Sequence, residues 1–521
     1  KDANNHVKHY VHDAFGRLMI VRDFEGTCYP GTGCNDPWTL YAESFYEYDA
    51  LDNLTDVWDA ADGPSGNNHT QMWYDALGRK VKMDDPDMGL WTYTYDENGN
   101  LKTQTDAKGQ TLWFKYDPLN RLEEKRLGGS GGALLASYTY DQGEYGKGRR
   151  TQMDDDSGHT TWTYDERGRV TRESKTIEGA GTFATQYEYD ALDRVTRMTY
   201  PDGEVVYHDY NEQGLLESLA GEDDYVQQAT YNALGQITTL PLGNGLTTSY
   251  VYDPLNFRLE RLQTGSLLDL QYWYDDVGNV TKIKDNENGG QEQHFTYDAL
   301  DRLTHAWTTG SGQGAYDRAY AYDKIGNIIY KSNLGEYAYE GNGHAHSQPH
   351  AVTTVFASDD QSYTYDSTEN GLAADGSSGF TPGCDLQCPE CIDLKLCKCV
   401  PCDDPPPEPP PPVEQATYSY DANGNMTQRT ESGVSYEQVF DAENRLRSVT
   451  VDGETTSFFY DGDGKRVLRV KPDGSKTVYV GGYFEMDFEK PEPPGNLDAA
   501  PVSNSRIRLT WRDESNNESG F

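Results

Sequence analysis

Large aromatic residues alternate with polar residues in short stretches along the whole chain. The stretch 91–95 reads Trp-Thr-Tyr-Thr-Tyr, in which single threonines separate the aromatic side chains. A period of two predicts a β-strand with its aromatic residues on one face. Asp96 and Gly99 follow this stretch. Because an aspartate carboxylate can accept backbone N–H bonds two residues on, and glycine tolerates a positive φ, we expect the strand to end in a tight turn.

The same phrase recurs from end to end: an aromatic residue, Asp, two or three variable residues, Gly or Asn, Arg or Asn, and then Leu or Val. Asp75, Asp96 and Asp117 are 21 residues apart, which is the length of one two-stranded unit. The copies begin at Tyr48, Tyr74, Tyr95, Tyr116, Tyr164, Tyr189, Tyr252, Tyr274, Tyr297, Tyr322, Tyr420, Phe440 and Tyr460, with weaker copies at His12, Tyr140, Tyr210 and Tyr231. We predict hairpins in series that share one sheet, stabilised by aromatic cross-strand pairs. The aspartates are expected to form turns and not to act as catalysts.

Composition changes this picture in two ways. The chain of 521 residues is only 35% apolar and carries a net charge of −42, values that alone would favour disorder, but 12% of its residues are aromatic and 39 are tyrosine. We therefore expect it to fold by burying tyrosine. The acidic balance argues against nucleic acid and anionic membranes as partners. No apolar run of about 18 residues is present, so no membrane insertion is expected.

The repeated phrase resembles the RHS/YD repeat of bacterial Rhs proteins, of the shell component of insecticidal toxin complexes and of animal teneurins. The form Asp-Ala-Leu-Gly-Arg at 75–79 is similar to the bacterial branch, and the resemblance covers nearly all of 1–485. It implies an all-β fold in which tandem hairpins spiral into a hollow shell or elongated barrel. Segments 341–344, 350–352 and 478–483 resemble phrases near the C-terminal part of such cores.

The C-terminal region departs from the toxin branch of that family, in which the shell encloses a cargo polypeptide and carries a self-cleavage motif around an Asp-Pro-x-Gly phrase. No such phrase follows Glu485, so that release mechanism is not carried over. Segments 494–499 and 505–511 resemble the first two strands of a fibronectin type III module, with Ile507, Leu509 and Trp511 alternating with polar residues. Either the rest of this module lies outside the sequence, or its strands pair with a neighbouring molecule. We expect a YD-repeat shell over 1–366, a Cys-rich and Pro-rich insertion over 367–416, the final repeats over 417–488, and a linker with a partial fibronectin-like module over 489–521.

Cysteines gather in the insertion, and two interpretations stay open. The Cys-x-x-Cys spacings are those of a zinc site, whereas an even cysteine count in an extracellular protein suggests disulfides. We favour disulfides, because a short turn that a disulfide could close separates the remaining pair near the N-terminus. The disulfide candidates are Cys28, Cys34, Cys384, Cys388, Cys391, Cys397, Cys399 and Cys402.

Few other residues suggest a site. His344, His346 and His350 are weak candidates for a metal site, because their flanking residues match scaffold phrases of the family. Acidic clusters at 84–87, 154–156 and 461–463 could bind Ca²⁺ weakly, but none has a complete loop with a bidentate glutamate, and no cofactor is expected. We recognise no Walker loop, dinucleotide fingerprint, nucleophile elbow or metalloprotease helix, so the chain is not expected to be an enzyme.

These features predict a secreted or cell-surface structural protein of a bacterium, acting as an extracellular fibre, matrix or adhesion element. Such a protein would self-associate into fibres or bind a glycan or another cell-surface ligand. The alternative is the encapsulating shell of a polymorphic toxin or effector carrier, whose cargo domain lies outside this chain. An Asp-Pro-x-Gly phrase and a variable domain in a longer sequence would favour the carrier, and further fibronectin-like modules would favour the surface element.

Overall fold

A computed structural model describes residues 1–28, 36–60, 68–339, 348–357 and 414–488, and the backbone of strands at 363–366, 371–374, 495–503 and 506–512. Every regular element in these ranges is a β-strand. In the described part of the chain, no helix is long and apolar enough to cross a membrane. The predicted all-β fold of hairpin repeats wound into a hollow shell is confirmed.

The first sheet has 19 antiparallel strands. They are β1 (Val7–His12), β2 (Leu18–Glu25), β3 (Thr39–Tyr48), β4 (Leu54–Trp58), β5 (His69–Tyr74), β6 (Lys80–Asp85), β7 (Gly89–Tyr95), β8 (Leu101–Thr105), β9 (Thr111–Tyr116), β10 (Leu122–Leu127), β11 (Ala133–Tyr140), β12 (Arg150–Asp155), β13 (Gly158–Tyr164), β14 (Val170–Ile177), β15 (Gly181–Tyr189), β16 (Val195–Thr199), β17 (Val205–Tyr210), β18 (Leu216–Ala220) and β19 (Asp224–Val226).

The second sheet has 20 strands and continues the first, because the backbone N–H of Gln227 donates to the carbonyl of Pro241 across the junction. Its strands are β20 (Thr230–Tyr231), β21 (Ile237–Pro241), β22 (Thr247–Tyr252), β23 (Leu259–Thr264), β24 (Leu268–Tyr274), β25 (Val280–Asp285), β26 (Gln291–Tyr297), β27 (Leu303–Thr309), β28 (Asp317–Tyr322), β29 (Ile328–Lys331), β30 (Gly335–Ala338), β31 (Thr354–Phe356), β34 (Glu414–Tyr420), β35 (Met426–Glu431), β36 (Val434–Phe440), β37 (Leu446–Val451), β38 (Glu454–Tyr460), β39 (Arg466–Val470), β40 (Lys476–Val480) and β41 (Phe484–Phe488).

Sequence neighbours pair with each other throughout, so the chain is one long antiparallel ribbon with turns along both edges. We call the turns that hold the aspartate of the repeated phrase the phrase turns, and those at the opposite edge the linker turns. The expected aromatic cross-strand pairs are not the rule: Tyr93 lies opposite Gln104, and Tyr95 opposite Leu101. The tyrosines instead contact other groups, described below.

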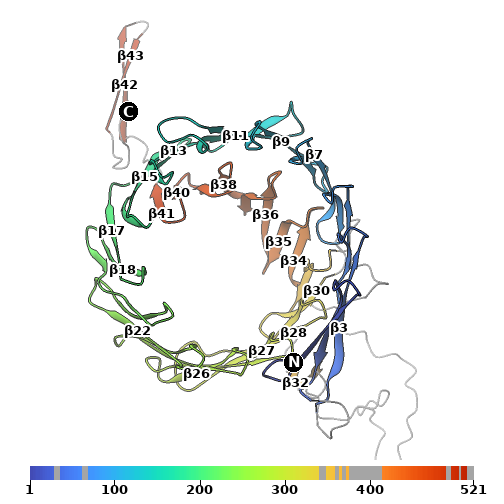
Figure 1. Ribbon diagram of the computed structural model, residues 1–521. Helices are drawn as coiled ribbons and strands as arrows, with labels where there is room; N and C mark the ends of the chain where they lie inside the picture. The colour runs from blue at the N-terminus through green and yellow to red at the C-terminus, as the bar shows by residue number, and fades with distance from the viewer. Residues whose placement is uncertain are drawn as a thin grey trace, which may run out of the picture.

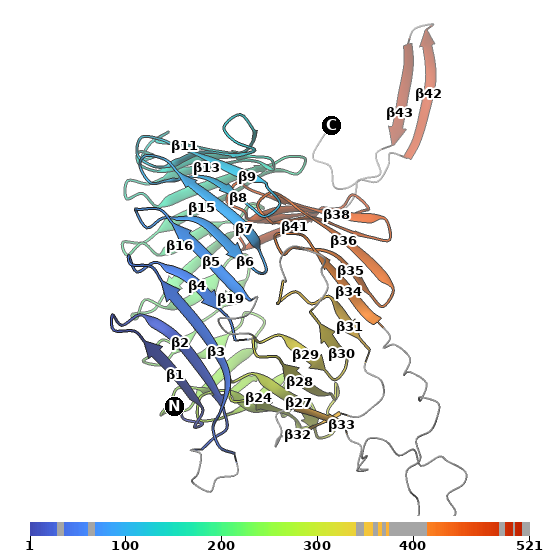
Figure 2. The same ribbon diagram turned by 90° about the vertical axis from the view of Figure 1, so that its right-hand side faces the viewer.

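The ribbon curves into a ring and then passes a second time along its own wall (Figure 1). Contacts that join the two passes link residues 261 to 337 positions apart in the sequence, which is the length of one circuit. We refer to 1–274 as the first circuit and 275–488 as the second. Figure 1 shows β34 to β41 of the second circuit lying inside β7 to β15 of the first, and Figure 2 shows the two circuits side by side along the axis of the ring.

The expected insertion leaves the wall between two strands that pair directly. Val355 of β31 lies opposite Ala416 of β34. Between these strands, β32 (Tyr363–Asp366) and β33 (Gly371–Ala374) pair only with each other. The strand that carries Tyr365 therefore does not belong to the wall. Near the C-terminus, β42 (Gly495–Ser503) and β43 (Arg506–Arg512) form a separate antiparallel hairpin, which leaves the fibronectin-like module a prediction.

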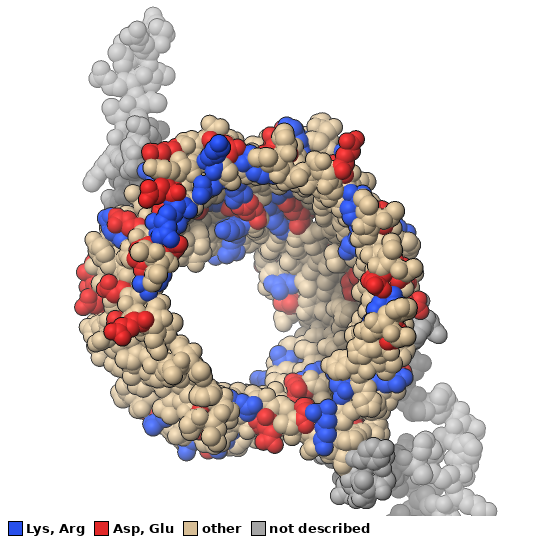
Figure 3. Space-filling model, in the orientation of Figure 1, with Lys and Arg blue, Asp and Glu red and all other residues tan. Residues whose placement is uncertain are grey.

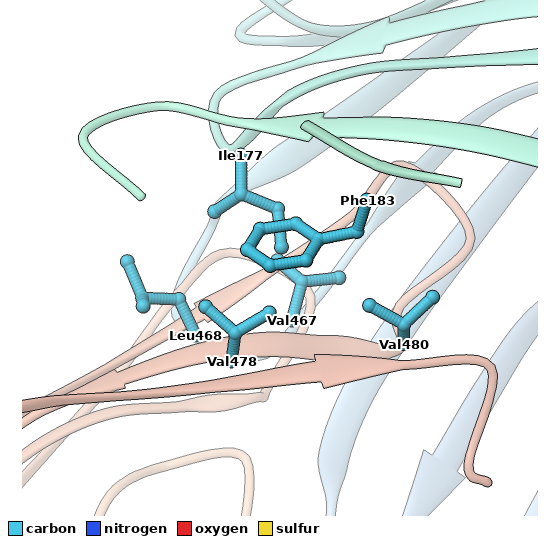
Figure 4. Close-up of a cluster of buried hydrophobic side chains, with 6 residues drawn as sticks. All are labelled: Ile177, Phe183, Val467, Leu468, Val478 and Val480. Carbon is cyan, nitrogen blue, oxygen red and sulfur yellow. The ribbon is translucent and has the colours of Figure 1, made fainter. Parts of the chain in front are cut away.

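A hydrophobic core forms where the inner layer lies against the outer one. Ile177 and Phe183 of the first circuit pack against Val467, Val478 and Val480 of the second (Figure 4). Leu468 completes this cluster, and all six side chains are almost fully buried. Burial of apolar surface between layers stabilises the closed ring, since the ribbon alone has no second layer to cover this face.

Candidate functional site: the lumen and the seam that closes it

The same type of phrase turn connects pairs of strands all around the ring. In the turn at 75–79, Asp75 Oδ1 accepts the backbone N–H of Leu77 at 2.9 Å and that of Arg79 at 3.0 Å. Asp75 Oδ2 accepts a third bond from Arg79 Nε at 2.7 Å. Together these bonds lower the pKa of the Asp75 carboxyl, with the Arg79 side chain as the largest cause. The aspartates are therefore turn formers, as the sequence indicates.

Side chains of each repeat also contact the next repeat along the chain. Tyr95 Oη donates to the carbonyl of Lys80 at 2.7 Å, one hairpin back, and the Arg79 guanidinium lies 4.6 Å from the centre of the Tyr95 ring. The repeated phrase predicts Arg or Asn at this position, but it carries no signal of this contact with the next tyrosine. Tyrosine-to-carbonyl bonds recur at Tyr74, Tyr116, Tyr140, Tyr164, Tyr189, Tyr210, Tyr231, Tyr252, Tyr274, Tyr297, Tyr322, Tyr339 and Tyr460.

The tyrosine face of the wall points toward the inside of the ring. Tyr138 Oη donates to the carbonyl of Gly462 at 2.8 Å, and Gly462 lies in the turn between β38 and β39, which Figure 1 shows in the inner layer. Tyr140 lies two residues on and therefore shares this face. Since paired strands keep one face inward, the repeated tyrosines line the lumen wherever no second layer covers them. Tyr250, Tyr272 and Phe295 occupy the position of Tyr138 in the uncovered arc, and all three are partly buried.

The lumen is enclosed by the wall and is open in the end view of Figure 3. Acidic and basic residues are scattered around the rim, with no large area of one sign on this face (Figure 3). Burial raises the pKa of Tyr420, in the second circuit, to about 12, so its phenol is neutral at physiological pH. The tyrosine side chains of this face combine apolar rings with polar tips.

A polar seam joins the two circuits. At its start the edges meet: Asn4 Nδ2 donates to Asp275 Oδ2 at 2.9 Å, and Tyr41 Oη donates to the carbonyl of Asp323 at 2.9 Å. Further along, Lys108 Nζ lies 2.9 Å from Asp421 Oδ2. In each contact a phrase turn of the second circuit lies against the linker-turn edge of the first.

Buried ion pairs complete the seam where the layers overlap. Lys175 Nζ lies 2.5 Å from Asp461 Oδ2, with side chains 6% and 3% exposed. Lys125 Nζ lies 2.5 Å from Glu443 Oε1 and 3.0 Å from the carbonyl of Gly462. Breaking one partner of such a pair leaves a charge buried and uncompensated, so loss of either side chain should destabilise the closed geometry.

All three predicted acidic clusters contribute to this seam, the cluster at 84–87 through the contact of Asp87 with His350. Asp155 Oδ2 accepts the backbone N–H of Gly462 at 2.8 Å, and burial raises the pKa of Asp155. Arg150 forms two bonds with Asp463, at 2.8 and 2.6 Å. In the third cluster Asp85 Oδ1 accepts the backbone N–H groups of Asp87 and Met88. These carboxylates bind groups of the protein, and their affinity for Ca²⁺ stays a prediction.

Of the three candidate histidines, His350 lies within the described residues. His350 Nδ1 lies 2.7 Å from Asp87 Oδ2, and this hydrogen bond raises the pKa of the imidazole. His344 and His346 lie outside the described residues, so their metal binding stays a prediction. Among the cysteines, Cys28 lies within the described residues and is disulfide-bonded. Cys34 and the six cysteines of the insertion lie outside them, and the disulfide pairing stays a prediction.

One group that sequence analysis missed brings three potential metal ligands together within the described residues. Asp2, His6 and Asp301 meet across the seam with ligand atoms within 4.8 Å of one another. His6 also lines a cavity of about 680 Å³ between the circuits. No local signal could have linked these residues, since Asp301 comes from the other circuit.

Comparisons with known proteins agree with this architecture. The family model of the Teneurin YD-shell matches residues 39–197 and 111–285, and that of the RHS Repeat matches 274–313. The tRNA nuclease WapA of Bacillus subtilis strain 168 is 26% identical over 263 residues, which cover 48% of this chain and 10% of that protein. Toxin subunit YenC2 of Yersinia entomophaga is 29% identical over 149 residues, covering 21% and 15% of the two chains.

The chain spans about a tenth of WapA and about a seventh of YenC2. Among solved structures, the Tc holotoxin pore of Photorhabdus luminescens aligns with a TM-score of 0.67 at 18% identity, covering 98% of this chain and 26% of that one. The crystal structure of TcdB2-TccC3 aligns with a TM-score of 0.65 at 18% identity, covering 98% and 27%. At this identity the structural likeness shows the fold alone. The family models, the hairpin repeat and the fold together show that this chain is an RHS/YD-repeat protein whose repeats build a YD shell.

Proposed function

We propose that this chain forms the wall of a carrier shell, which encloses a polypeptide cargo encoded outside the chain. One observation carries the proposal: the ribbon closes on itself and seals its seam with buried ion pairs, leaving an enclosed lumen. The phenol groups suit an extended polypeptide, since they combine apolar rings with hydrogen-bonding tips.

The named relatives support this alternative over the fibre, matrix or adhesion element that sequence analysis favoured. One is named a toxin subunit and the other a tRNA nuclease. In the proposed role the wall needs no catalytic group of its own, and any enzymatic activity belongs to the cargo. The carrier would work outside the producing cell and associate with other subunits of a toxin complex. Glycan binding and fibre formation stay predictions from the sequence.

Protease protection tests the proposal. The protein is purified from its natural host and digested, and the polypeptides that survive are identified by mass spectrometry. We expect a polypeptide other than the wall to resist digestion in the wild type. It should be digested in the double variant Lys125→Ala/Lys175→Ala, because loss of both ammonium groups removes the buried ion pair of Asp461, leaves Glu443 paired only with Arg445 of its own circuit, and loosens the seam.

Lys115→Ala is the matched control, because Lys115 pairs with Glu123 at the exposed surface and takes no part in the seam. This variant should protect the cargo as the wild type does. An empty lumen in electron cryomicroscopy images of the host-purified protein, with no protected polypeptide, would contradict the carrier and leave the surface element as the better explanation.

A further inference from the structure

The second residue after the phrase aspartate is the tip of its turn, and in the first circuit this tip is repeatedly a large apolar residue. The apolar tips are 60% to 89% exposed: Phe15, Leu51, Leu77, Leu119, Leu192, Leu234 and Leu255. Large apolar side chains at such exposure are unfavourable in water when they recur along one edge. Their local geometry does not demand them, since Gln213 occupies the same position and its backbone N–H makes the same bond, to Asn211 Oδ1.

All these tips lie on one edge of the ribbon. Successive strands are antiparallel, so phrase turns alternate with linker turns and every phrase turn returns to the same edge. In the first circuit this edge forms one end of the shell: Figure 2 shows β1 to β16 at one end of the molecule and β34 to β38 at the other. We call this row of apolar tips the leucine rim.

The seam shows what covers such tips elsewhere in the molecule. In the second circuit the phrase-turn edge lies against the linker-turn edge of the first, and its apolar tips Val277, Leu300 and Ile325 are only partly exposed. Leu300 lines the cavity at the seam together with Gly26 and Thr27, which follow β2 at a linker turn. An apolar tip therefore has a defined partner in this architecture, the linker-turn edge of another circuit.

Where the opposite edge of the seam is polar, the residue at the turn tip is polar as well. Asn423 Nδ2 donates to Asp106 Oδ2 at 2.6 Å, and Glu443 pairs with Lys125. The tip position thus varies with what it touches. The residues of the leucine rim are apolar and occupy the same turn position as the covered tips of the second circuit. Within the described residues, however, no part of the wall lies against them.

We propose that the leucine rim is a docking edge that takes the linker-turn edge of a second copy of this chain, in a head-to-tail arrangement that repeats the seam between molecules. The described second circuit supplies that partner edge at turns such as 432–433 and 452–453. A rim-to-rim dimer is less well matched, because the seam pairs phrase turns with linker turns. The proposal concerns the outside of the shell and is independent of any cargo.

Electrostatics sets the conditions for this association. Each molecule carries a charge of −42, so two copies repel at low salt. On the rim itself many charges cancel locally, as in the pairs of Arg79 with Asp75 and of Arg121 with Asp117. We therefore expect association to strengthen as salt screens the net repulsion while burial of the leucines persists.

Sedimentation velocity of the full chain tests the docking edge. At about 0.5 M NaCl, where the Debye length is about 4 Å, the wild type should form larger species as protein concentration rises about a hundredfold. A head-to-tail contact does not close on itself, so the series should continue past the dimer. The variant Leu77→Gln/Leu119→Gln/Leu192→Gln should weaken association at least about tenfold. Gln213 shows that a phrase turn accepts this residue, so the fold should be kept.

Val251→Thr/Val439→Thr is the control, since both valines are about half exposed on strands away from the tips. It should associate like the wild type. A chain that stays monomeric over the whole concentration and salt range overturns the proposal, as does a series that stops at the dimer. Equal association of the rim variant and the wild type would overturn it too, because the leucines would then lie outside the contact.

Discussion

Phe257 departs from the turn chemistry that most of the wall shares. The left-handed position of the phrase turn holds glycine, or Asn or Asp, as at Asn120 with φ of 62° and Asn444 with φ of 60°. At 253–258 an extra residue shifts this position to Phe257, which has φ of 61°. A bulky side chain is rare in this conformation, whereas asparagine adopts it readily.

Replacement of Phe257 should therefore stabilise the protein. We expect Phe257→Asn to raise the free energy of unfolding by about 0.5 to 1 kcal/mol, since it relieves backbone strain at little cost in packing. Phe257→Ala keeps a Cβ without the preference of asparagine and should bring no comparable gain. Urea denaturation checks both variants, and slower hydrogen exchange over 253–258 would locate the effect. Equal stability of the Asn and Ala variants would show that the backbone there is unstrained.

The residue pattern predicted the contacts within each turn but not the contacts between successive repeats. Asp75 and Gly78 were recognisable because both act within their own turn. The contact of Arg79 with Tyr95 was not, because it joins two units and depends on the curvature of the sheet. The same limit explains why aromatic cross-strand pairs were expected: alternation shows which residues share a face, but the register decides which of them lie opposite each other.

At the scale of elements, the two circuits are held together by contacts that no local pattern predicts. His350 was a weak metal candidate from its neighbours in sequence, yet its partner Asp87 lies 263 residues away. Likewise, the repeated phrase predicts a turn at Asp461, but nothing in the sequence around Lys175 or Asp461 indicates that the two side chains meet. The repeats predict the antiparallel ribbon, but which residues meet across the seam depends on the path that the ribbon takes around the ring.

The pair of His350 and Asp87 should make one part of the seam sensitive to pH. Because the hydrogen bond to Asp87 raises the pKa of His350, protonation favours the attached state. This contribution is present in full below the unfolded pKa of about 6.5 and is lost as pH rises through the higher folded value. We expect an NMR titration of the His350 imidazole to give a pKa above 6.5 in the wild type and a lower one in Asp87→Asn. His350→Gln identifies the signal by removing it.

Buried and exposed lysines should differ sharply in their effect on the seam. Lys175→Met leaves Asp461 unpaired in the interior, so we expect a loss of about 3 to 5 kcal/mol. Lys115→Met removes an exposed pair with Glu123 and should change stability little. Denaturation measures both, and hydrogen exchange should show faster opening of β38 to β40 in Lys175→Met alone. Similar losses in the two variants would mean that the pair of Lys175 and Asp461 is accessible to water.

At the scale of the whole molecule, the wall keeps its geometry across the insertion. Gln348 contacts Asp87 over 261 residues, whereas beyond the insertion Asp421 contacts Lys108 over 313. The difference, 313 − 261 = 52, is close to the length of the chain between β31 and β34. The circuit therefore has nearly the same length with the insertion left out, which indicates that the ring does not depend on it.

Excision of the insertion tests this independence. Phe356 lies opposite Glu414, so an Asn-Gly hairpin turn in place of residues 357–413 can join β31 to β34. The shorter loop also has a smaller closure entropy, about 0.6 kcal/mol for each halving of loop length. We expect the excised protein to keep its β-sheet circular dichroism, to show the same ring in electron micrographs, and to unfold at an unchanged or slightly higher urea concentration. A control that also removes β31, over 354–413, takes a strand out of the wall and should shift the seam contacts of every later repeat. If the excised protein fails to close while its strands still form, the insertion itself must bridge the two circuits, and the closed wall would then require more than its hairpin repeats.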